Sequence, residues 1–504
     1  MAVLAAGLNL PLTDGDTALY ATVARDALAR GEWVAYTFRD GRVFDKPPLT
    51  LWLLQVSIAA FGTAEWAVRL WHLALALATA GATYRVARLV LPVRESLLAA
   101  VVLLTSAQFF YQALVPQQDV PLTLFVALAV YGYLRWEADG RVVWAVVAGV
   151  AAGLAVLSKG LVGVVLPALV AGTRLVVDRP RPPARWPVAL AVAAAACLAV
   201  AAPWFVAAGL RQGREFVETF FGGGTLGVGR FFRPALSAPG WVPAAAGLFA
   251  YAVFLPLGLL PWTGWLWPAL REGLRARDRV LRVCFLWVVA VLVFLSVSPG
   301  DKVIRFLLPV FPPASVLLAS VVSDPRRIRG ASAVSLAAGG LLTAALVTLA
   351  AAPLPAEVTP FRPVAAALLL PLAGGLAVSS LLLRTRAGRS AVPALAAAAL
   401  AGYSLLLVAT ARQWDRMSPW RPVARMVEVA AAEDTHVLVE GEPTPFAWFY
   451  IRRPVRFVSR DGLAAEWTSG RVVAVMPVDM VAALPGPPVV VGGAPGGLVV
   501  VKNY

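Results

Sequence analysis

Lysine is scarce in this 504-residue chain. Only four of its 44 basic residues are lysines, namely Lys46, Lys159, Lys302 and Lys502, and arginine supplies the rest. Charge is scarce in general, at 14% of residues against about 25% in an average soluble domain, whereas hydrophobic residues make up 60%. So little charge beside so much apolar surface excludes a soluble globule. The composition predicts a protein that crosses a membrane several times.

Cysteine and histidine are scarcer still, with two residues of each kind. Cys197 and Cys284 lie in separate apolar runs, so no disulfide framework is indicated. His72 and His436 are distant from each other, and no spacing typical of metal ligands is visible. We therefore assign no metal ligand and no certain cofactor, although the acidic residues discussed below leave room for a divalent metal. A Walker A loop and a dinucleotide-binding glycine pattern are also missing.

Apolar runs of about 20 residues, the length that crosses roughly 30 Å of hydrocarbon, recur between residues 64 and 410. The twelve expected segments are approximately 64–84, 96–115, 120–134, 142–157, 160–177, 187–208, 243–266, 283–298, 306–322, 331–352, 363–383 and 391–410. Residues 1–12 are apolar but too short to span. We interpret them as the remainder of a first crossing or as an interfacial segment, because no basic region precedes them as in a signal peptide. The predicted fold class is an all-α polytopic membrane protein with about 12 to 13 transmembrane helices.

Arginine is concentrated in alternate connectors between these segments. The arginine-rich connectors are 85–94, 135–141, 179–185, 271–282, 326–329 and 384–389. The positive-inside rule places them in the cytoplasm and predicts that residues 14–63, the loop 209–242 and the tail after 411 face outward. The net charge of +16 is then an orientation signal and an attraction to anionic lipids. It is not evidence for a nucleic-acid partner.

The tail differs from the rest of the chain because its apolar runs are short and β-branched. These runs are 435–439, 455–458, 472–476, 489–491 and 498–501, with glycine and proline between them. A helix capped by Ser418, with Pro419 in its first position, is expected before them. We predict a transmembrane domain over residues 1–410 and a small extracytoplasmic α/β domain over residues 411–504.

The outward segment 14–63 carries most of the ionisable groups of interest. Asp16 precedes an amphipathic stretch, residues 17–30, and the simplest interpretation of a lone acid there is an N-cap. Asp45 and Lys46 precede two prolines that suit the first turn of a helix. Asp119 is placed similarly before Pro121, again as a cap. Each acid has a structural explanation alone, but all three are expected on the same face of the membrane.

The three lysines near the predicted membrane edge also have a simple explanation. A lysine at the end of a transmembrane helix extends its ammonium group to the lipid headgroups. Lys46, Lys159 and Lys302 are nevertheless expected on one side, in a chain that otherwise uses arginine. Grouped cations of this kind favour an anion-binding site.

Six motifs together resemble a known family. The motifs are the helix start with Asp16 and Tyr20, the runs 45–52, 119–123 and 157–160, the run 203–205, and the run 302–309. In this order they resemble the bacterial protein O-mannosyltransferases and aminoarabinose lipid A transferases, glycosyltransferases of the GT-C superfamily. The resemblance covers the whole helical domain, and the tail resembles the outer α/β domain of that group.

The resemblance implies transfer of a sugar from a polyprenyl phosphate donor to an acceptor lipid, protein or glycan. The reaction would take place on the outer face of the bacterial cytoplasmic membrane, by displacement with inversion. Asp16 matches the family's catalytic acid, with Asp45 and Asp119 as further candidates for proton transfer, metal contact or lysine orientation. Lys46 and Lys159 match basic positions expected to hold the donor phosphate.

Three further residues are candidates for the same phosphate site, namely Arg230, Lys302 and Arg305. The loop 220–230 departs from the family pattern, since it lacks the expected His-Asn after its aromatic pair. The first motif departs too, with Thr17 and Leu19 where many relatives have an acid and a base. These departures bear on the identity of the acceptor more than on the class of donor.

Two other functional classes remain open. A multi-pass transporter or flippase would share the hydropathy, but the middles of the predicted segments contain no Asp, Glu, Lys or Arg. A non-catalytic scaffold would not explain acids and lysines gathered on one face. Enzymatic sugar transfer is therefore the preferred hypothesis.

Overall fold

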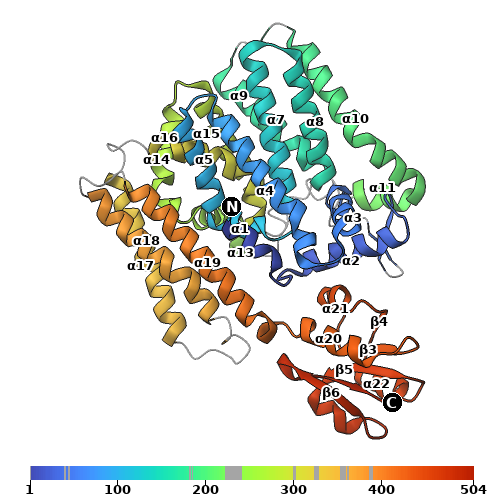
Figure 1. Cartoon of the computed structure of the whole chain (residues 1–504). Helices are drawn as coiled ribbons and strands as arrows, with labels where there is room; N and C mark the ends of the chain where they lie inside the picture. Colours follow the sequence, from blue (N-terminus) through green and yellow to red (C-terminus); the bar gives the residue numbers. More distant parts are fainter. Residues whose placement is uncertain are drawn as a thin grey trace.

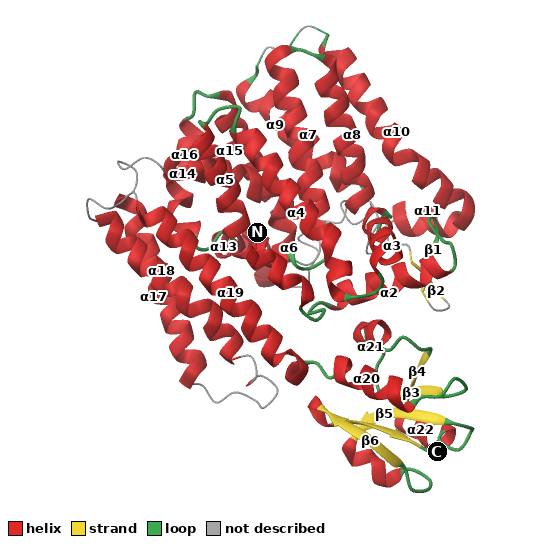
Figure 2. Cartoon of the chain, in the orientation of Figure 1, coloured by secondary structure: helices red, strands yellow, loops and turns green. Residues whose placement is uncertain are grey.

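The computed structural model is mostly helical, with a small sheet near the carboxyl end of the chain (Figures 1 and 2). It describes residues 2–38, 41–43, 46–180, 183, 185–221, 241–298, 302–322, 329–351, 359, 362–384 and 390–504. The amino-terminal elements are α1 (Ala2–Ala6), η1 (Gly7–Asn9), α2 (Gly15–Ala29), β1 (Tyr36–Phe38), β2 (Gly41–Val43) and α3 (Leu49–Phe61). Strands β1 and β2 pair in antiparallel fashion.

The long helices follow. They are α4 (Glu65–Ala87), α5 (Val93–Thr105), α6 (Ala107–Ala113), α7 (Asp119–Asp139), α8 (Val142–Lys159), α9 (Val162–Asp178), α10 (Trp186–Gln212), α11 (Arg214–Phe221), α13 (Trp241–Gly258), η3 (Trp262–Trp265), α14 (Leu266–Arg275), α15 (Arg279–Val297), η4 (Ile304–Val310), α16 (Phe311–Val322), α17 (Arg329–Ala351), α18 (Arg362–Arg384) and α19 (Ala391–Met417). Each of the twelve predicted segments coincides with one of these helices or with a bent pair. Among the described residues, six helices have the length and hydropathy of a complete span, or up to eight if each bent pair is one span.

Two predicted segments are not continuous helices. The segment 96–115 bends by 70° between α5 and α6. The segment 243–266 bends by 116° where α13 ends and the run of η3 and α14 begins. At the first bend Ser106 has an extended backbone. The backbone groups on either side of Ser106 form hydrogen bonds with residues far away in the sequence. The Ala107 amide donates to the Leu260 carbonyl at 2.8 Å, and the Thr105 carbonyl accepts from the Tyr403 hydroxyl at 2.8 Å. Backbone groups freed within a membrane need such partners.

Helices α8 and α10 cross closely because glycine lies at their contact. A Cβ built on Gly149 would lie 2.2 Å from the Ala193 carbonyl oxygen, and one on Gly153 would lie 2.8 Å from the Cys197 carbonyl oxygen. Small residues allow such close backbone approach between membrane helices, where dispersion contacts replace the hydrophobic effect. The close packing holds α8, and therefore its last residue, Lys159, in a defined place.

The carboxyl-terminal part contains all five predicted strands. They are β3 (His436–Glu440), β4 (Val455–Val458), β5 (Val472–Pro477), β6 (Val489–Ala494) and β7 (Leu498–Lys502), in the order β4-β3-β5-β7-β6, and the helical elements there are α20 (Trp420–Ala430), α21 (Pro445–Tyr450), α22 (Arg460–Glu466), η8 (Val478–Ala483) and η9 (Pro495–Gly497). Strand β3 runs parallel to β4 and β5, and β7 is antiparallel to β5 and β6. The predicted helix is present as α20, but Pro419 is its N-cap and no side chain caps it, so the cap predicted at Ser418 is wrong.

The central strand of this sheet is buried on both faces. Val473 and Val475 pack in the apolar cluster with α20, whereas Val472, Ala474 and Met476 pack in the cluster with α22. Alternate residues of a strand point to opposite faces, so a continuous apolar run is expected where both faces are covered. This explains why an unbroken run of apolar residues in the tail forms a strand and not a further transmembrane helix.

The sheet domain contacts the helical part through α21, which packs against α2 (Figure 1). The Leu12 amide donates to the Tyr450 hydroxyl at 2.9 Å, and Arg25 donates to the Trp448 carbonyl at 3.3 Å. Arg421 of α20 forms an ion pair with Glu65 of α4 at 2.8 Å. Burial raises the pKa of the Tyr450 hydroxyl, and the nearby Glu65 carboxylate raises it further, so the phenol stays protonated at neutral pH.

Candidate functional site

Helix α2 begins beside the candidate site, and one acid lies at its N-cap and another in its first turn. Asp14 is the N-cap, since its carboxylate accepts from the Thr17 amide at 2.9 Å. The prediction that Asp16 serves as the N-cap is therefore wrong, and Asp16 lies one residue inside the helix. The cap belongs to Asp14 because Asp14 has the extended backbone that an N-cap residue adopts.

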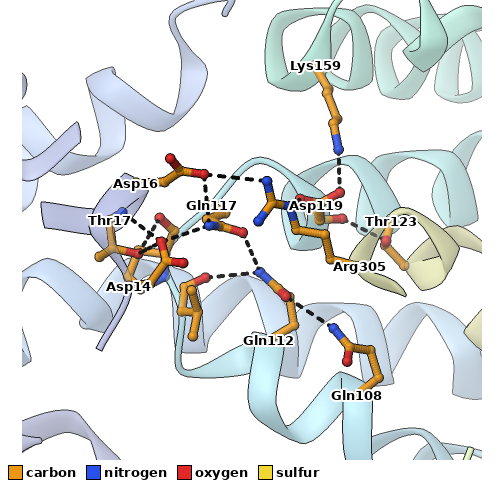
Figure 3. Close-up of polar contacts among 12 residues, drawn as sticks. Asp14, Asp16, Thr17, Gln108, Gln112, Gln117, Asp119, Thr123, Lys159 and Arg305 are labelled. Atoms are coloured by element: carbon orange, nitrogen blue, oxygen red, sulfur yellow. Dashed lines mark hydrogen bonds and ion pairs between the residues drawn. The ribbon is translucent and has the colours of Figure 1, made fainter. Parts of the chain in front are cut away.

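Asp119 and Lys159 face each other from the ends of neighbouring helices (Figure 3). Asp119 is the first residue of α7, and the preceding residue, Gln118, is in the N-cap position. Asp119 is therefore not the predicted cap. Its carboxylate instead accepts a hydrogen bond from the Lys159 ammonium. The ammonium also lies 4.2 Å from the ring centroid of Phe306, a cation–π contact.

Arg305 of η4 lies between the two acids (Figure 3). Its Nη2 is 3.4 Å from Oδ2 of Asp16, and its Nε is 3.8 Å from Oδ2 of Asp119. The sequence predicts phosphate binding for Arg305 and does not predict that one guanidinium bridges both carboxylates. Three segments far apart in the chain thus meet in one ionic network.

The two acids differ in access to solvent. The Asp16 side chain is 49% exposed, whereas the Asp119 side chain is 2% exposed. The side chains of Lys159 and Arg305 are 17% and 31% exposed. The Asp16 carboxylate is therefore accessible to solvent, whereas the Asp119 carboxylate is enclosed beside Lys159 and Arg305.

Lys46 belongs to the same neighbourhood. It lies just before α3, whose N-cap is Pro48, and its charge acts on Lys159. The two prolines therefore precede the helix and do not form its first turn, because the helical backbone begins at Leu49. Two like charges held near one another favour an anion between them.

A ladder of glutamine side chains leads to the acids, and sequence reasoning assigned it no role. Gln108 donates to Gln112 at 3.4 Å, Gln112 donates to Gln117 at 2.9 Å, and Gln117 donates to Asp14 at 2.8 Å and to Asp16 at 3.4 Å (Figure 3). The only sequence signal was the placement of Gln117 two residues before Asp119. The ladder fixes which end of the Gln117 amide faces the acids.

Lys302 is placed differently from the other predicted cations. Its ammonium donates to the carbonyls of Leu295, at 2.9 Å, Ser296, at 3.1 Å, and Ser298. These carbonyls are at the carboxyl end of α15, where a cation is favoured by the helix dipole. These contacts account for three N–H donors of the ammonium group, so the structure gives Lys302 a capping role.

Two predicted site residues, Asp45 and Arg230, lie outside the described residues. Within the described ranges no group of three or more His, Cys, Asp or Glu side chains is arranged to hold a metal ion. His72 is buried in α4, and its Nε2 lies 2.9 Å from the Gln112 carbonyl. His72 thus contacts the backbone of the glutamine ladder.

An aromatic cluster lies next to the ionic network. Trp204, Phe216 and Phe220 pack with Leu157, two residues before Lys159. A Cβ on Gly160 would lie 3.7 Å from the Phe220 ring. Lys159 thus lies at the edge of a buried aromatic cluster.

Residues 45–206 match the sequence profile of the dolichyl-phosphate-mannose-protein mannosyltransferase family. Over 326 residues the chain is 30% identical to the undecaprenyl phosphate-α-4-amino-4-deoxy-L-arabinose arabinosyl transferase of Aeromonas salmonicida, and the match covers 62% of this chain and 56% of that protein. The corresponding transferase 1 of Proteus mirabilis is 30% identical over 321 residues, with 61% and 55% covered. The match therefore spans a little over half the length of these curated relatives.

The structural similarity extends over the whole chain. The crystal structure of ArnT from Cupriavidus metallidurans bound to undecaprenyl phosphate superposes with a TM-score of 0.81 at 24% identity, covering 100% of this chain and 96% of that one. The apo structure of the same protein gives 0.79 at 23% identity, with the same coverage. The resemblance predicted from the motifs is confirmed at the level of the fold: this chain has the fold of ArnT, a multi-pass helical membrane fold with a small mixed sheet at its carboxyl end.

Proposed function

We propose that this chain transfers a sugar from a polyprenyl phosphate donor to an acceptor lipid, protein or glycan. The observation that carries the proposal is the ionic network in which Arg305 pairs with both Asp16 and Asp119, and Asp119 also pairs with Lys159. It combines the half-exposed carboxylate of Asp16 with cations, one of which, Lys159, lies beside a buried aromatic cluster. The similar transferases supply the donor class, an undecaprenyl phosphate amino sugar.

The cations suit the leaving group of such a transfer. When the bond between the anomeric carbon and the phosphate oxygen breaks, the electron pair stays on that oxygen and the carrier phosphate gains negative charge. Lys159, Lys46 and Arg305 are positioned to stabilise this charge at a partly buried place, where a cation acts more strongly than in water. Asp119 orients Lys159 and Arg305 and is itself too buried to meet the acceptor.

Asp16 suits the other half of the reaction. An acceptor hydroxyl that attacks the anomeric carbon must lose its proton, and a carboxylate within hydrogen-bond reach can accept it. Asp16 is the more exposed of the two acids that Arg305 contacts. If the acceptor is instead a phosphate group that is already ionised, Asp16 orients it through Arg305 without taking a proton.

The distribution of charge supports an outward-facing site. Glu137, Arg174, Asp178 and Arg282 are joined by ion pairs near the ends of α7 and α9, and Asp119 is at the opposite end of α7. That arginine-rich end corresponds to connectors assigned to the cytoplasm. The network of Asp16, and the sheet domain that packs on α2, are then extracytoplasmic.

The proposal is tested with purified protein in nanodiscs, a labelled undecaprenyl phosphate aminoarabinose donor and a lipid A acceptor, followed by mass spectrometry of the products. Asp16→Asn is expected to lower turnover at least about a hundredfold and to leave carrier binding intact, because the amide cannot accept the proton. Lys46→Ala and Lys159→Ala are expected to weaken binding of undecaprenyl phosphate roughly tenfold or more.

Lys502→Ala is the matched control, because Lys502 lies in β7 of the sheet domain, where its ammonium is 4.7 Å from the Tyr504 ring centroid. It is expected to leave carrier binding unchanged. Equal effects of all three lysine changes would exclude a specific phosphate site. Movement of the intact donor across the bilayer without covalent transfer would identify a flippase instead.

A further inference from the structure

Arg69 of α4 is a buried cation bound to backbone carbonyls. Its side chain is 2% exposed. The guanidinium donates from Nε to the Leu114 carbonyl at 2.9 Å, from Nη2 to the Pro11 carbonyl at 2.7 Å, and from Nη1 to the carbonyls of Leu8, at 3.2 Å, and Leu10. One side chain thus joins the segment before α2 to the end of α6.

The binding mode is unusual for a buried arginine. None of the ion pairs shown within the described ranges includes Arg69, and the nearest acid on its own helix, Glu65, pairs with Arg421 at 2.8 Å. Taking a guanidinium out of water is costly, so hydrogen bonds must satisfy its donors. Its planar, rigid fork fixes the relative positions of the carbonyls that it binds, which a lysine ammonium cannot do.

In both segments that Arg69 joins, the candidate site residues follow the bound carbonyl at the same distance in sequence. Asp14 and Asp16 follow Pro11 by three and five residues, and Gln117 and Asp119 follow Leu114 by three and five residues. The segments meet again beyond the clamp, where Gln117 donates to Asp14 at 2.8 Å and the Thr17 hydroxyl donates to the Pro116 carbonyl at 3.4 Å.

We propose that Arg69 is a positioning residue that sets the separation of Asp16 from Asp119, and thereby the gap that Arg305 bridges. It contacts neither acid and acts through the two backbone segments. The inference rests on the proposed function for its consequence in catalysis, because Asp16 must face the acceptor while Asp119 holds the phosphate-binding cations. The claim that Arg69 holds the two backbone segments together does not depend on that function.

The test compares Arg69→Lys with wild type and with Arg174→Lys. Arg174 is a suitable control because it is also a poorly exposed arginine, but its partners are Glu137 and Asp178, away from Asp119. Hydrogen exchange is measured by mass spectrometry over peptides covering residues 8–17 and 114–119. Binding of undecaprenyl phosphate, kcat and KM for the labelled donor are measured on the same monodisperse samples.

Arg69→Lys is expected to speed exchange in both peptides by roughly tenfold. It is expected to lower kcat by about tenfold or more, because small displacements of reacting groups slow the reaction strongly, with carrier binding and KM within about threefold of wild type. Arg174→Lys is expected to change neither. If Arg69→Lys does not give monodisperse protein, Arg69→Gln is measured in the same way, since its amide still donates to carbonyls.

Unchanged exchange in both peptides overturns the proposal, whatever the enzyme's reaction. Faster exchange with unchanged kcat per carrier-binding site also overturns it, because Arg69 would then only stabilise the fold. If the wild-type protein shows no sugar transfer, the proposed function fails by itself, and the exchange data still decide whether Arg69 holds the two segments together.

Discussion

Lys159, the last residue of α8, donates a hydrogen bond to Asp119, the first residue of α7, although forty residues separate them in the chain. The Asp119 side chain is 2% exposed and that of Lys159 is 17% exposed, so water screens this pair only partly. A buried pair of this kind holds a cation in place more than it stabilises the fold.

Asp119→Asn removes the charge that balances Lys159. We expect a loss of stability on the order of 3 kcal/mol, because the cation stays in a poorly solvated place, and a loss of carrier binding because the ammonium is no longer oriented. The double change Asp119→Asn with Lys159→Met should be more stable than Asp119→Asn alone. Thermal unfolding of detergent-solubilised samples checks this, and additive losses would show that the two side chains do not interact.

Gln117→Leu interrupts the hydrogen-bonded ladder at the acids. Gln117 donates to Asp14 and Asp16, and it accepts from Gln112. We expect kcat to fall roughly tenfold with little change in KM, because Asp16 loses a donor that orients its carboxylate. Gln108→Leu, three hydrogen bonds away from Asp16, serves as the control. Equal effects of the two substitutions would argue against orientation of Asp16 by Gln117.

Lys302→Met separates a capping role from a phosphate-binding role. The ammonium donates to carbonyls at the end of α15, so we expect a loss of about 1–3 kcal/mol in stability as these carbonyls lose a charged donor. The affinity for undecaprenyl phosphate should remain within about twofold of wild type, in contrast to Lys159→Ala. A large loss of carrier affinity with normal stability would show that Lys302 contributes to the phosphate site.

Tyr450→Phe tests whether the sheet domain supports the candidate site. The Tyr450 hydroxyl accepts from the Leu12 amide, two residues before Asp14, and its loss should cost about 1 kcal/mol at that contact. Hydrogen exchange over residues 8–17 should increase. Tyr504→Phe is matched to it, because Tyr504 donates to the Ala430 carbonyl at 2.6 Å within the sheet domain. The control should leave the exchange of residues 8–17 unchanged.

Gly153→Ala tests the close crossing of α8 and α10. The new Cβ would lie 2.7 Å from Val200 Cβ and 2.8 Å from the Cys197 carbonyl oxygen, so we expect a loss of about 1–3 kcal/mol through overpacking. Gly172→Ala in α9 is the control, since nothing lies within 4 Å of its added Cβ. That substitution should be neutral or slightly stabilising because alanine favours helix. Equal stability of the two variants would contradict the packing described here.

Local patterns in the sequence predicted much of the fold. Each of the twelve apolar runs coincides with a helix or a bent pair of helices, because the length of an apolar run limits how it can bury its backbone polar groups. The five β-branched runs of the tail are strands, and the alternation of Val472 and Val473 between two apolar clusters follows from the two-residue period of a strand. The family resemblance also came from short motifs.

The positions of helix bends and of N-cap residues could not be predicted from the sequence. The bend at Ser106 depends on Leu260 and Tyr403, which are far away in the chain and accept or donate the bonds freed there. Asp14 and not Asp16 caps α2, because capping depends on the backbone angles of one residue. Two acids separated by a glycine did not show which of them would adopt those angles.

Local sequence patterns predicted a protein that crosses a membrane and a sheet in its tail, and they placed Asp16, Lys46, Asp119 and Lys159 in motifs that resemble those of one glycosyltransferase group. Which of these groups meet depends on the packing of the helices. Arg305 reaches Asp16 across 289 residues, Lys302 turns to the end of α15, and Arg69 joins the two segments that carry the acids. Contacts between residues so distant in sequence depend on how helices pack, and no local pattern records them.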